Sequence, residues 1–339
     1  MALLEVDALT VRFGGLTAVD RVGFSVDEGQ IVSLIGPNGA GKTTLFNAVT
    51  AVHPASSGRV RFAGQDLRAP LSFGAMARIL LMALGVGALV QVCSDIEGLW
   101  QVAVVDRFDY GQQAWAVRDA WHAAVRHLRA QGPWPALVGG MVGAAAAFNA
   151  WRTGRLQPLR ARRLGIARTF QNIRLFSELS VIDNVLVGLA GAPYGPLAAL
   201  LRLPRWRRGE TAMRIRARDL LAFVGLERFA DVPAGGLPYG HQRRLEIARA
   251  LAGDPRLLLL DEPAAGMNPA EGADLIELIR AIRARGVTVL LIEHHMNVVM
   301  GISDRVVVLD HGVRIAEGDP KTVSCDPKVI EAYLGKEEA

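Results

Sequence analysis

The sequence predicts an α/β fold built on a parallel sheet and interrupted by one apolar insert. Short apolar runs such as "QIVSLIG", "RLLLLDEP" and "GVTVLLIEHH" are typical of buried parallel strands. They alternate with segments whose apolar residues recur at three- and four-residue steps, which indicates helices. Strands that alternate with helices are typical of a parallel sheet. From about residue 70 to 159 the composition changes, and the earlier pattern returns at Gly165.

The flanking elements complete this prediction. Residues 1–64 look β-rich, with "LLEVDALTVRF", "VGFSVDEG" and "GRVRFAGQDL" as strands and "KTTLFNAVTAV" as a helix. Further along, we expect helices in "VIDNVLVGLA", "ETAMRIRARDLLAFVGL" and "EGADLIELIRAIRAR". The length of 339 residues fits two domains, or one domain with a large insert.

Charge and cysteine content restrict the function only weakly. The net charge of +5 fits a partner that carries phosphate, either a nucleotide or a lipid headgroup. Cys93 and Cys325 have no metal-ligand spacing and form no disulfide framework. We therefore expect a reducing compartment.

The strongest motif is "GPNGAGKT", from Gly36 to Thr43, which fits G-x-x-x-x-G-K-[ST] between a strand and a helix. Its glycines allow backbone N–H groups to close around phosphate oxygens, and the helix N-terminus adds partial positive charge. We expect Lys42 to reach the β- and γ-phosphates and Thr43 to bind Mg²⁺. The motif predicts a nucleotide triphosphate site.

Two further strand ends carry polar residues that suit the same ligand. Asp261 and Glu262 follow "LLLL", and open α/β sheets bind ligands at the carboxyl ends of their strands. We expect Asp261 to hold Mg²⁺ through water and Glu262 to polarise the attacking water as a general base. His294 follows "LLIE" in the same way and is a candidate contact to the γ-phosphate.

Together these motifs resemble the ATPase subunit of an ATP-binding cassette (ABC) transporter. Five more pieces stand in the order of that family: "VRFGGLTAV" with Phe13, "RTFQNIRLF" with Gln171, the signature-like "LPYGHQRRLEIARAL", "AAGMNP" and "EHHM". The resemblance implies a P-loop NTPase cassette with a parallel-sheet core, an antiparallel β subdomain and a helical subdomain at about 172–240. It covers 1–70 and 160–335 and leaves 71–159 as an all-α insert.

The resemblance also implies roles for individual residues. It implies Lys42, Gln171, Glu262 and His294 as catalytic residues, and Thr43, Gln171 and Asp261 as Mg²⁺ ligands. It implies that ATP is held by Phe13, Gly36, Asn38, Gly39, Ala40, Gly41, Lys42, Thr43 and Thr44, and is capped from a second subunit by Tyr239, Gly240 and His241.

Within the family, the chain most resembles the LivG-type ATPases of bacterial branched-chain amino acid importers. That likeness implies a second ATPase subunit (a heterodimer, or else a homodimer), two membrane permeases, an indirect link to a periplasmic binding protein, and no nucleic acid. It places the chain at the cytoplasmic face of the inner membrane. Three departures stand out: Pro238 replaces the usual Ser, His241 a common Gln, and His295 a usual Asp. Loss of the Ser hydroxyl predicts unequal ATP sites in the dimer.

Other functions remain open from the sequence. Urea and amide importers share much of the pattern, and a lipid or lipopolysaccharide exporter is a further alternative. Non-transport ABC proteins usually carry two cassettes or a long coiled-coil insert, whereas this chain has one cassette and an apolar insert.

The insert contains two runs long enough to cross a bilayer as helices. Leu71 to Cys93 has Arg78 as its single charged residue, and Ala130 to Trp151 has no charged residue. Arginines at the cassette ends, tryptophans near the run ends and Gly139-x-x-x-Gly143 favour a membrane-inserted hairpin with both ends cytosolic. The alternative is a soluble or interfacial insert, since "GGMVGAAAA" is only mildly apolar and Ala114 to Leu128 predicts an amphipathic helix.

Overall fold

The computed structural model describes residues 2–67, 72–109, 114–115, 117–153, 158–189, 201 and 204–334. Its contacts divide the chain into two compact units. The first, here called the cassette, comprises 1–68 and 156–339, and the second, here called the insert, comprises 69–155.

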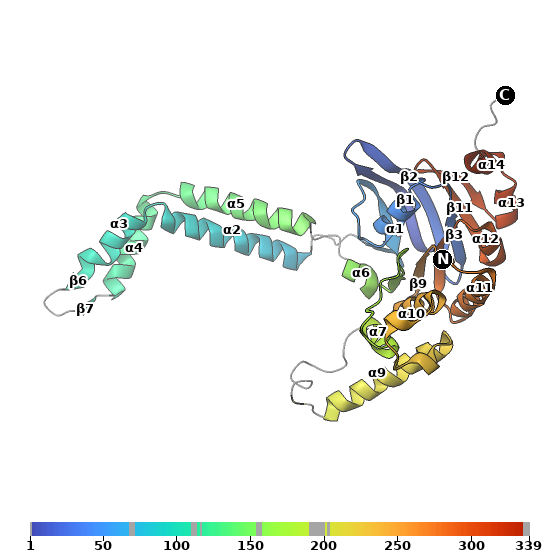
Figure 1. The fold of residues 1–339 in the computed structure, drawn as a ribbon. Helices are drawn as coiled ribbons and strands as arrows, with labels where there is room; N and C mark the ends of the chain where they lie inside the picture. The colour runs from blue at the N-terminus through green and yellow to red at the C-terminus, as the bar shows by residue number, and fades with distance from the viewer. Residues whose placement is uncertain are drawn as a thin grey trace. The chain divides into compact units, whose positions relative to one another are not determined.

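The cassette is organised by a six-stranded sheet in the order β12-β11-β3-β10-β9-β8 (Figure 1). The strands are β3 (Ile31–Ile35), β8 (Ile166–Arg168), β9 (Leu257–Asp261), β10 (Thr288–Ile292), β11 (Arg305–Asp310) and β12 (Val313–Gly318). All neighbours pair in parallel except β11 and β12. The predicted parallel sheet is therefore confirmed, and its strand register aligns Leu34, Ile292 and Asp261 at the carboxyl edge.

A second, antiparallel sheet has the order β2-β1-β4-β5. It contains β1 (Ala2–Phe13), β2 (Leu16–Asp27), β4 (Ser57–Phe62) and β5 (Gln65–Asp66). The segment "GRVRFAGQDL" was expected to be one strand, but it is two, because Ala63 and Gly64 both take positive φ and turn the chain. The expected helix after the glycine-rich loop is α1 (Lys42–Val49).

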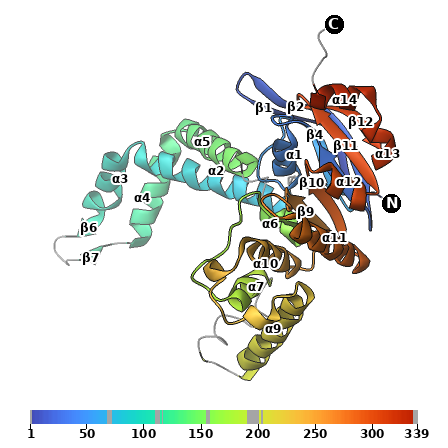
Figure 2. The same ribbon diagram turned by 45° about the vertical axis from the view of Figure 1, so that its right-hand side comes forward.

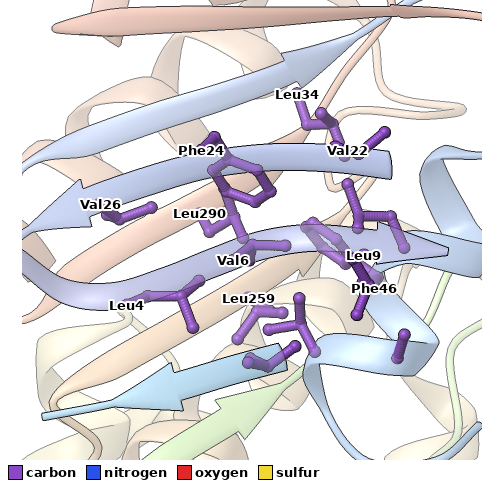
Figure 3. Close-up of a cluster of buried hydrophobic side chains, with 14 of the residues drawn as sticks. Leu4, Val6, Leu9, Val22, Phe24, Val26, Leu34, Phe46, Leu259 and Leu290 are labelled. Carbon is purple, nitrogen blue, oxygen red and sulfur yellow. The ribbon is translucent and has the colours of Figure 1, made fainter. Parts of the chain in front are cut away.

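Side-chain alternation in the central strands builds three cores, two of which include residues of β9. On β9, Leu257 and Leu259 join the core shared with the antiparallel sheet and α1, while Leu258 and Leu260 join the other. Figure 3 shows the first core, where Leu259 and Leu290 lie among Leu4, Val6 and Phe24. Strands covered on both faces need apolar residues at every position, which explains their continuous apolar runs.

Helices contribute to the core that contains Leu258 and Leu260. They are α7 (Val181–Gly188), α9 (Pro204–Phe223), α10 (Tyr239–Leu251) and α11 (Pro269–Ala284), and Figure 2 shows α7, α9 and α10 grouped together. Short helices complete the unit: α6 (Pro158–Arg163), η2 (Glu227–Phe229), η3 (Ala234–Gly236), α12 (Met296–Ile302), α13 (Pro320–Ser324) and α14 (Pro327–Leu334).

The insert is a pair of long helices, α2 (Phe73–Cys93) and α5 (Trp134–Thr153), which lie side by side (Figure 1). Between them in sequence are α3 (Ile96–Ala103), η1 (Val105–Arg107), β6 (Phe108–Asp109), β7 (Ala114–Trp115) and α4 (Val117–Ala130). The amphipathic helix was expected from Ala114, but residues 114–115 pair with 108–109 instead, and the helix begins at Val117.

Small residues allow α2 and α5 to approach closely. A Cβ atom on Gly139 would lie 2.7 Å from the Val90 Cβ, and one on Gly143 would lie 2.6 Å from the Met82 carbonyl oxygen. The spacing Gly139-x-x-x-Gly143 therefore forms the helix contact that the sequence predicted. Among the described residues, α2 is the one helix that is long and apolar enough to cross a membrane; α5, the second predicted span, does not meet that criterion.

Candidate nucleotide-binding site

The glycine-rich loop joins β3 to α1 at the carboxyl edge of the central sheet. Gly41 has φ +91°, and a Cβ atom there would lie 2.4 Å from the Ala18 carbonyl oxygen. Gly36 has φ +149°, and a Cβ atom there would lie 2.1 Å from the Leu309 carbonyl oxygen. Both positions thus require glycine, and the resulting loop leaves the N-terminal N–H groups of α1 without side-chain caps. Such groups are donors for an anion.

Lys42 is buried at the start of α1, and its ammonium is folded onto the loop itself. Its Nζ donates to the Gly36 carbonyl at 2.8 Å and to the Pro37 carbonyl at 2.9 Å. Burial lowers the pKa of Lys42, while the charges of Glu262 and Asp261 oppose that shift. A phosphate group would give this desolvated cation the full counter-charge that two carbonyls do not provide.

Asp261 lies at the end of β9, buried, with its two carboxylate oxygens in different situations. Oδ2 accepts from Arg168 Nη2 at 2.8 Å, and Oδ1 is buried with no hydrogen-bond partner in the described structure. Burial raises the pKa of Asp261, opposed by the hydrogen bond and charge of Arg168. An orphaned carboxylate oxygen beside a phosphate-binding loop fits a hard cation such as Mg²⁺, either directly or through water.

Three predicted residues meet around the Glu262 carboxylate. Gln171 Nε2 donates to Glu262 Oε2 at 2.8 Å, and His294 Nδ1 lies 3.9 Å from Glu262 Oε1. The Glu262 backbone has φ +45°, which a non-glycine residue rarely adopts, and its N–H donates to the Ile292 carbonyl. The structure thus brings together Gln171, Glu262 and His294, from three separate parts of the sequence.

A buried ion pair that the sequence analysis missed holds the backbone next to the cluster of Gln171, Glu262 and His294. Arg243 and Glu246 on α10 are fully buried and joined at 2.8 Å. Arg243 Nη2 donates to the Gln171 carbonyl at 2.9 Å, and Glu246 accepts from the Phe170 N–H. The pair therefore fixes the backbone that carries Gln171. In sequence, "HQRRLE" looks like a solvated helix face, so it gives no sign of this role.

Glu293 is a further residue that the sequence analysis missed. It is fully buried beside His294 and accepts from the Ala264 N–H at 2.9 Å and from His295 Nδ1 at 3.1 Å. It therefore ties the loop after Glu262 to the segment that carries His294. His295, which departs from the family pattern, contributes to this tie. A charged residue directly after the buried run "TVLLI" was the available signal.

The remaining predicted residues lie in three places. Phe13 ends β1, 41% exposed, with its ring 4.7 Å from that of His53. On the glycine-rich loop and α1, Gly36 and Ala40 are buried, Gly41 and Thr44 are half-buried, and Asn38, Gly39 and Thr43 are exposed. At the start of α10, Tyr239 is 44% exposed and Gly240 is buried, whereas the His241 ring lies 5.2 Å from that of Phe229.

This fold and site define a P-loop nucleotide-binding protein: a phosphate-binding loop between strand and helix, with acidic residues at the end of a nearby parallel strand. Comparison with protein families identifies the family of P-loop proteins to which the chain belongs. The ABC transporter family model matches residues 19–115 and 145–265, and the branched-chain amino acid ATP-binding cassette transporter model matches 313–339. The first match omits 116–144, which lie in the insert.

Individual relatives agree. The chain is 36% identical over 336 residues to the high-affinity branched-chain amino acid transport ATP-binding protein BraF of Pseudomonas aeruginosa, covering 98% of each chain. It is equally identical to LivG of Escherichia coli, with the same coverage. A crystal structure of the ADP conformation of an ATP-binding cassette from an ABC transporter superposes with a TM-score of 0.65 at 27% identity, covering 99% of this chain and 100% of that one. The chain belongs to the ABC transporter ATP-binding family, whose members hydrolyse ATP and work with membrane permease components.

Proposed function

We propose that this chain powers a bacterial importer of branched-chain or other amino acids, acting at the cytoplasmic face of the inner membrane. The observation that carries the catalytic part is the contact of Gln171 and His294 with Glu262, beside the loop of Lys42. The cargo is proposed from the relatives, whose names specify branched-chain amino acids.

In this proposal, Thr43, Gln171 and Asp261 would hold Mg²⁺, which would supply positive charge to neutralise the triphosphate. The Asp261 Oδ1 atom, buried and without a partner, supports this assignment. Phe13 stacks on the adenine, and the N–H groups of the loop from Gly36 to Thr44 cradle the phosphates.

Glu262 orients the attacking water and accepts its proton, because its carboxylate is held between Gln171 and His294. His294 places a ring N–H near the γ-phosphate, and Lys42 leaves its two carbonyls to neutralise the phosphate charge. Tyr239, Gly240 and His241 of a second ATPase subunit cap the nucleotide, where the N-terminus of α10 would favour the negative phosphates. Opening and closing of that dimer reach two permeases through the loop of Gln171, and a periplasmic binding protein delivers the cargo.

The catalytic assignment is tested by Glu262→Gln. We expect ATP turnover to fall about 10²- to 10⁴-fold with ATP binding retained, because the amide keeps the contacts but cannot accept a proton. The matched control is Glu277→Gln on the exposed face of α11, which should turn over normally. Turnover by Glu262→Gln within a factor of about two of the parent would reject Glu262 as the base. Uptake of labelled leucine by cells that carry the complete transporter tests the cargo separately.

A further inference from the structure

We infer that α2 and α5 cross the lipid bilayer as a hairpin and place α3 and α4 on the face opposite the cassette. This inference concerns the insert, and it stands or falls independently of the ATPase assignment.

The first argument is length. At 1.5 Å per residue, the 21 residues of α2 span about 31 Å and the 20 residues of α5 about 30 Å. The hydrocarbon core of a bilayer is about 30 Å thick. The two helices therefore match the bilayer together, although α5 is the less apolar of the two.

The second argument is the direction of the exposed apolar side chains. Leu80, Leu81 and Met82 are 61%, 72% and 47% exposed. Consecutive helical residues are rotated by about 100°, so these three face about 200° of the helix circumference. On α5, two adjacent pairs one helical turn apart are more than half exposed: Leu137 with Val138, and Met141 with Val142. A docked protein would cover one side of the hairpin, whereas a bilayer covers every side.

The third argument is the position of the charges in the two helices. Arg78 and Arg152 are their only charged residues, near the start of α2 and the end of α5. Both of these ends connect to the cassette, through the four-residue segments 68–71 and 154–157. Arg78 Nε donates to the Gly74 carbonyl, so the guanidinium turns back toward the start of α2. That orientation is expected of an arginine that reaches for headgroups on the cassette side.

The fourth argument is a polar cluster at the opposite end of the hairpin. The Gln91 side chain donates to the Leu128 and Gly132 carbonyls and accepts from the Ala136 N–H. The Gln91 side chain thereby provides hydrogen-bond partners for backbone groups at the end of α4 and the start of α5, where the apolar stretch ends. Beyond it, Asp95 pairs with His127 at 3.0 Å. Such a cluster marks a return to water, because unsatisfied backbone groups are too costly inside hydrocarbon.

Aromatic residues agree with this placement. Trp134 begins α5 and is 73% exposed, and Trp100 on α3 and Trp121 on α4 are also exposed. Exposed tryptophans beside the polar end of a hairpin suit the interface between hydrocarbon and water. On α4, the small Ala120 and Ala123 are buried, so its bulkier residues remain available on the surface.

The two natural cysteines provide the test, because both are exposed and they lie in different units. Cys93 ends α2, and Cys325 lies in the cassette. The full-length chain is produced in bacteria, and intact spheroplasts are treated with a membrane-impermeant maleimide before and after permeabilisation. Cys325→Ser retains Cys93 as the probe, and Cys93→Ser retains Cys325.

We expect the Cys93 probe to be labelled about equally before and after permeabilisation, and the Cys325 probe at least about tenfold more strongly afterwards. Protection of both probes in intact spheroplasts would overturn the crossing. If Cys93 stays unlabelled even after permeabilisation, His122→Cys in a background without the natural cysteines replaces it, because His122 lies on the exposed face of α4. The same two outcomes then apply.

A substitution in the middle of α2 separates lipid from water as the surroundings. Leu84 is 65% exposed. In a helix that faces water, Leu84→Lys would leave the chain unchanged, as exposed substitutions usually do. In the centre of a bilayer we expect Leu84→Lys to lower the carbonate-resistant membrane fraction at least about tenfold, with Leu84→Ala retained like the parent. Equal retention of all three chains, or release of the parent by carbonate, would reject the hairpin.

Discussion

Two leucine-rich runs in this chain differ in how far their side chains are exposed. Leu257 to Leu260 on β9 are completely buried, whereas Leu80, Leu81 and Leu84 on α2 are each more than 60% exposed. Strand β9 has a paired strand on either side and a packed core on each face. Helix α2 packs chiefly against α5. The comparison teaches that the sequence of an apolar run shows only that its side chains must be shielded from water. The neighbouring strands and helices determine whether other parts of the protein provide that shielding.

The largest loss of stability is expected when a charged side chain that is completely buried in the cassette is removed. We expect Arg243→Ala to lower the free energy of unfolding by about 3–5 kcal/mol, because Glu246 is left as a buried, uncompensated charge. Thermal unfolding measures this loss, and ATP turnover should fall with it as the Gln171 backbone loses its anchor.

The neighbouring residue is the control. Arg244 pairs with Asp274 at the same distance of 2.8 Å, but that carboxylate is largely exposed. Arg244→Ala should therefore change stability by about 0–1 kcal/mol. Equal losses for the two variants would mean that burial is not what distinguishes the two ion pairs.

The second test compares the two leucine runs directly. Leu259→Ala should cost about 2–5 kcal/mol, since it empties a site in the core of Figure 3. For a unit of this size that is a drop of about 5–15 °C in the unfolding midpoint. Leu84→Ala should leave the cassette transition within about 1 °C of the parent, because Leu84 is an exposed residue of the other compact unit. A comparable drop for both would show that the hairpin and the cassette unfold together.

The smallest effect concerns Lys42. Burial lowers its pKa in the folded chain, so the unfolded chain binds more protons between that value and 10.5. The stability of the parent therefore rises with pH in this window. Lys42→Met removes this dependence and should give a midpoint advantage over the parent that shrinks as the pH rises toward 10.5. An advantage that grows with pH would contradict the direction of the shift, and loss of the ATP-induced increase in midpoint confirms that the variant no longer binds nucleotide.

Local patterns explain which parts of the fold could be predicted. The central strands and the glycine-rich loop were predictable because each depends on residues adjacent in sequence. The contact of Gln171 with Glu262 joins positions 91 residues apart. Family resemblance implied a catalytic role for each residue, but neither resemblance nor spacing predicted their contact. Arg243, Glu246 and Arg168 escaped prediction because a charged residue on a helix or strand end usually faces solvent, and only distant partners reveal its burial.

The same reasoning applies to the insert. The length and apolar composition of the two runs placed α2 and α5 within a few residues, and the glycine spacing predicted their contact. The strand pair of β6 and β7 was missed because two-residue strands have no periodicity to detect. Surroundings of lipid or protein cannot be read from periodicity at all, since both require the same apolar residues.

The left-handed backbone of Glu262 has a consequence for how this chain evolves. Glycine adopts φ +45° freely, whereas glutamate is strained there by about 1–3 kcal/mol. Selection for expression or heat resistance alone would therefore favour replacement at this position, and each such replacement would remove the carboxylate that we propose as the general base. We expect screens for yield to recover glycine or asparagine at 262, so any screen of this kind needs a growth condition that depends on uptake.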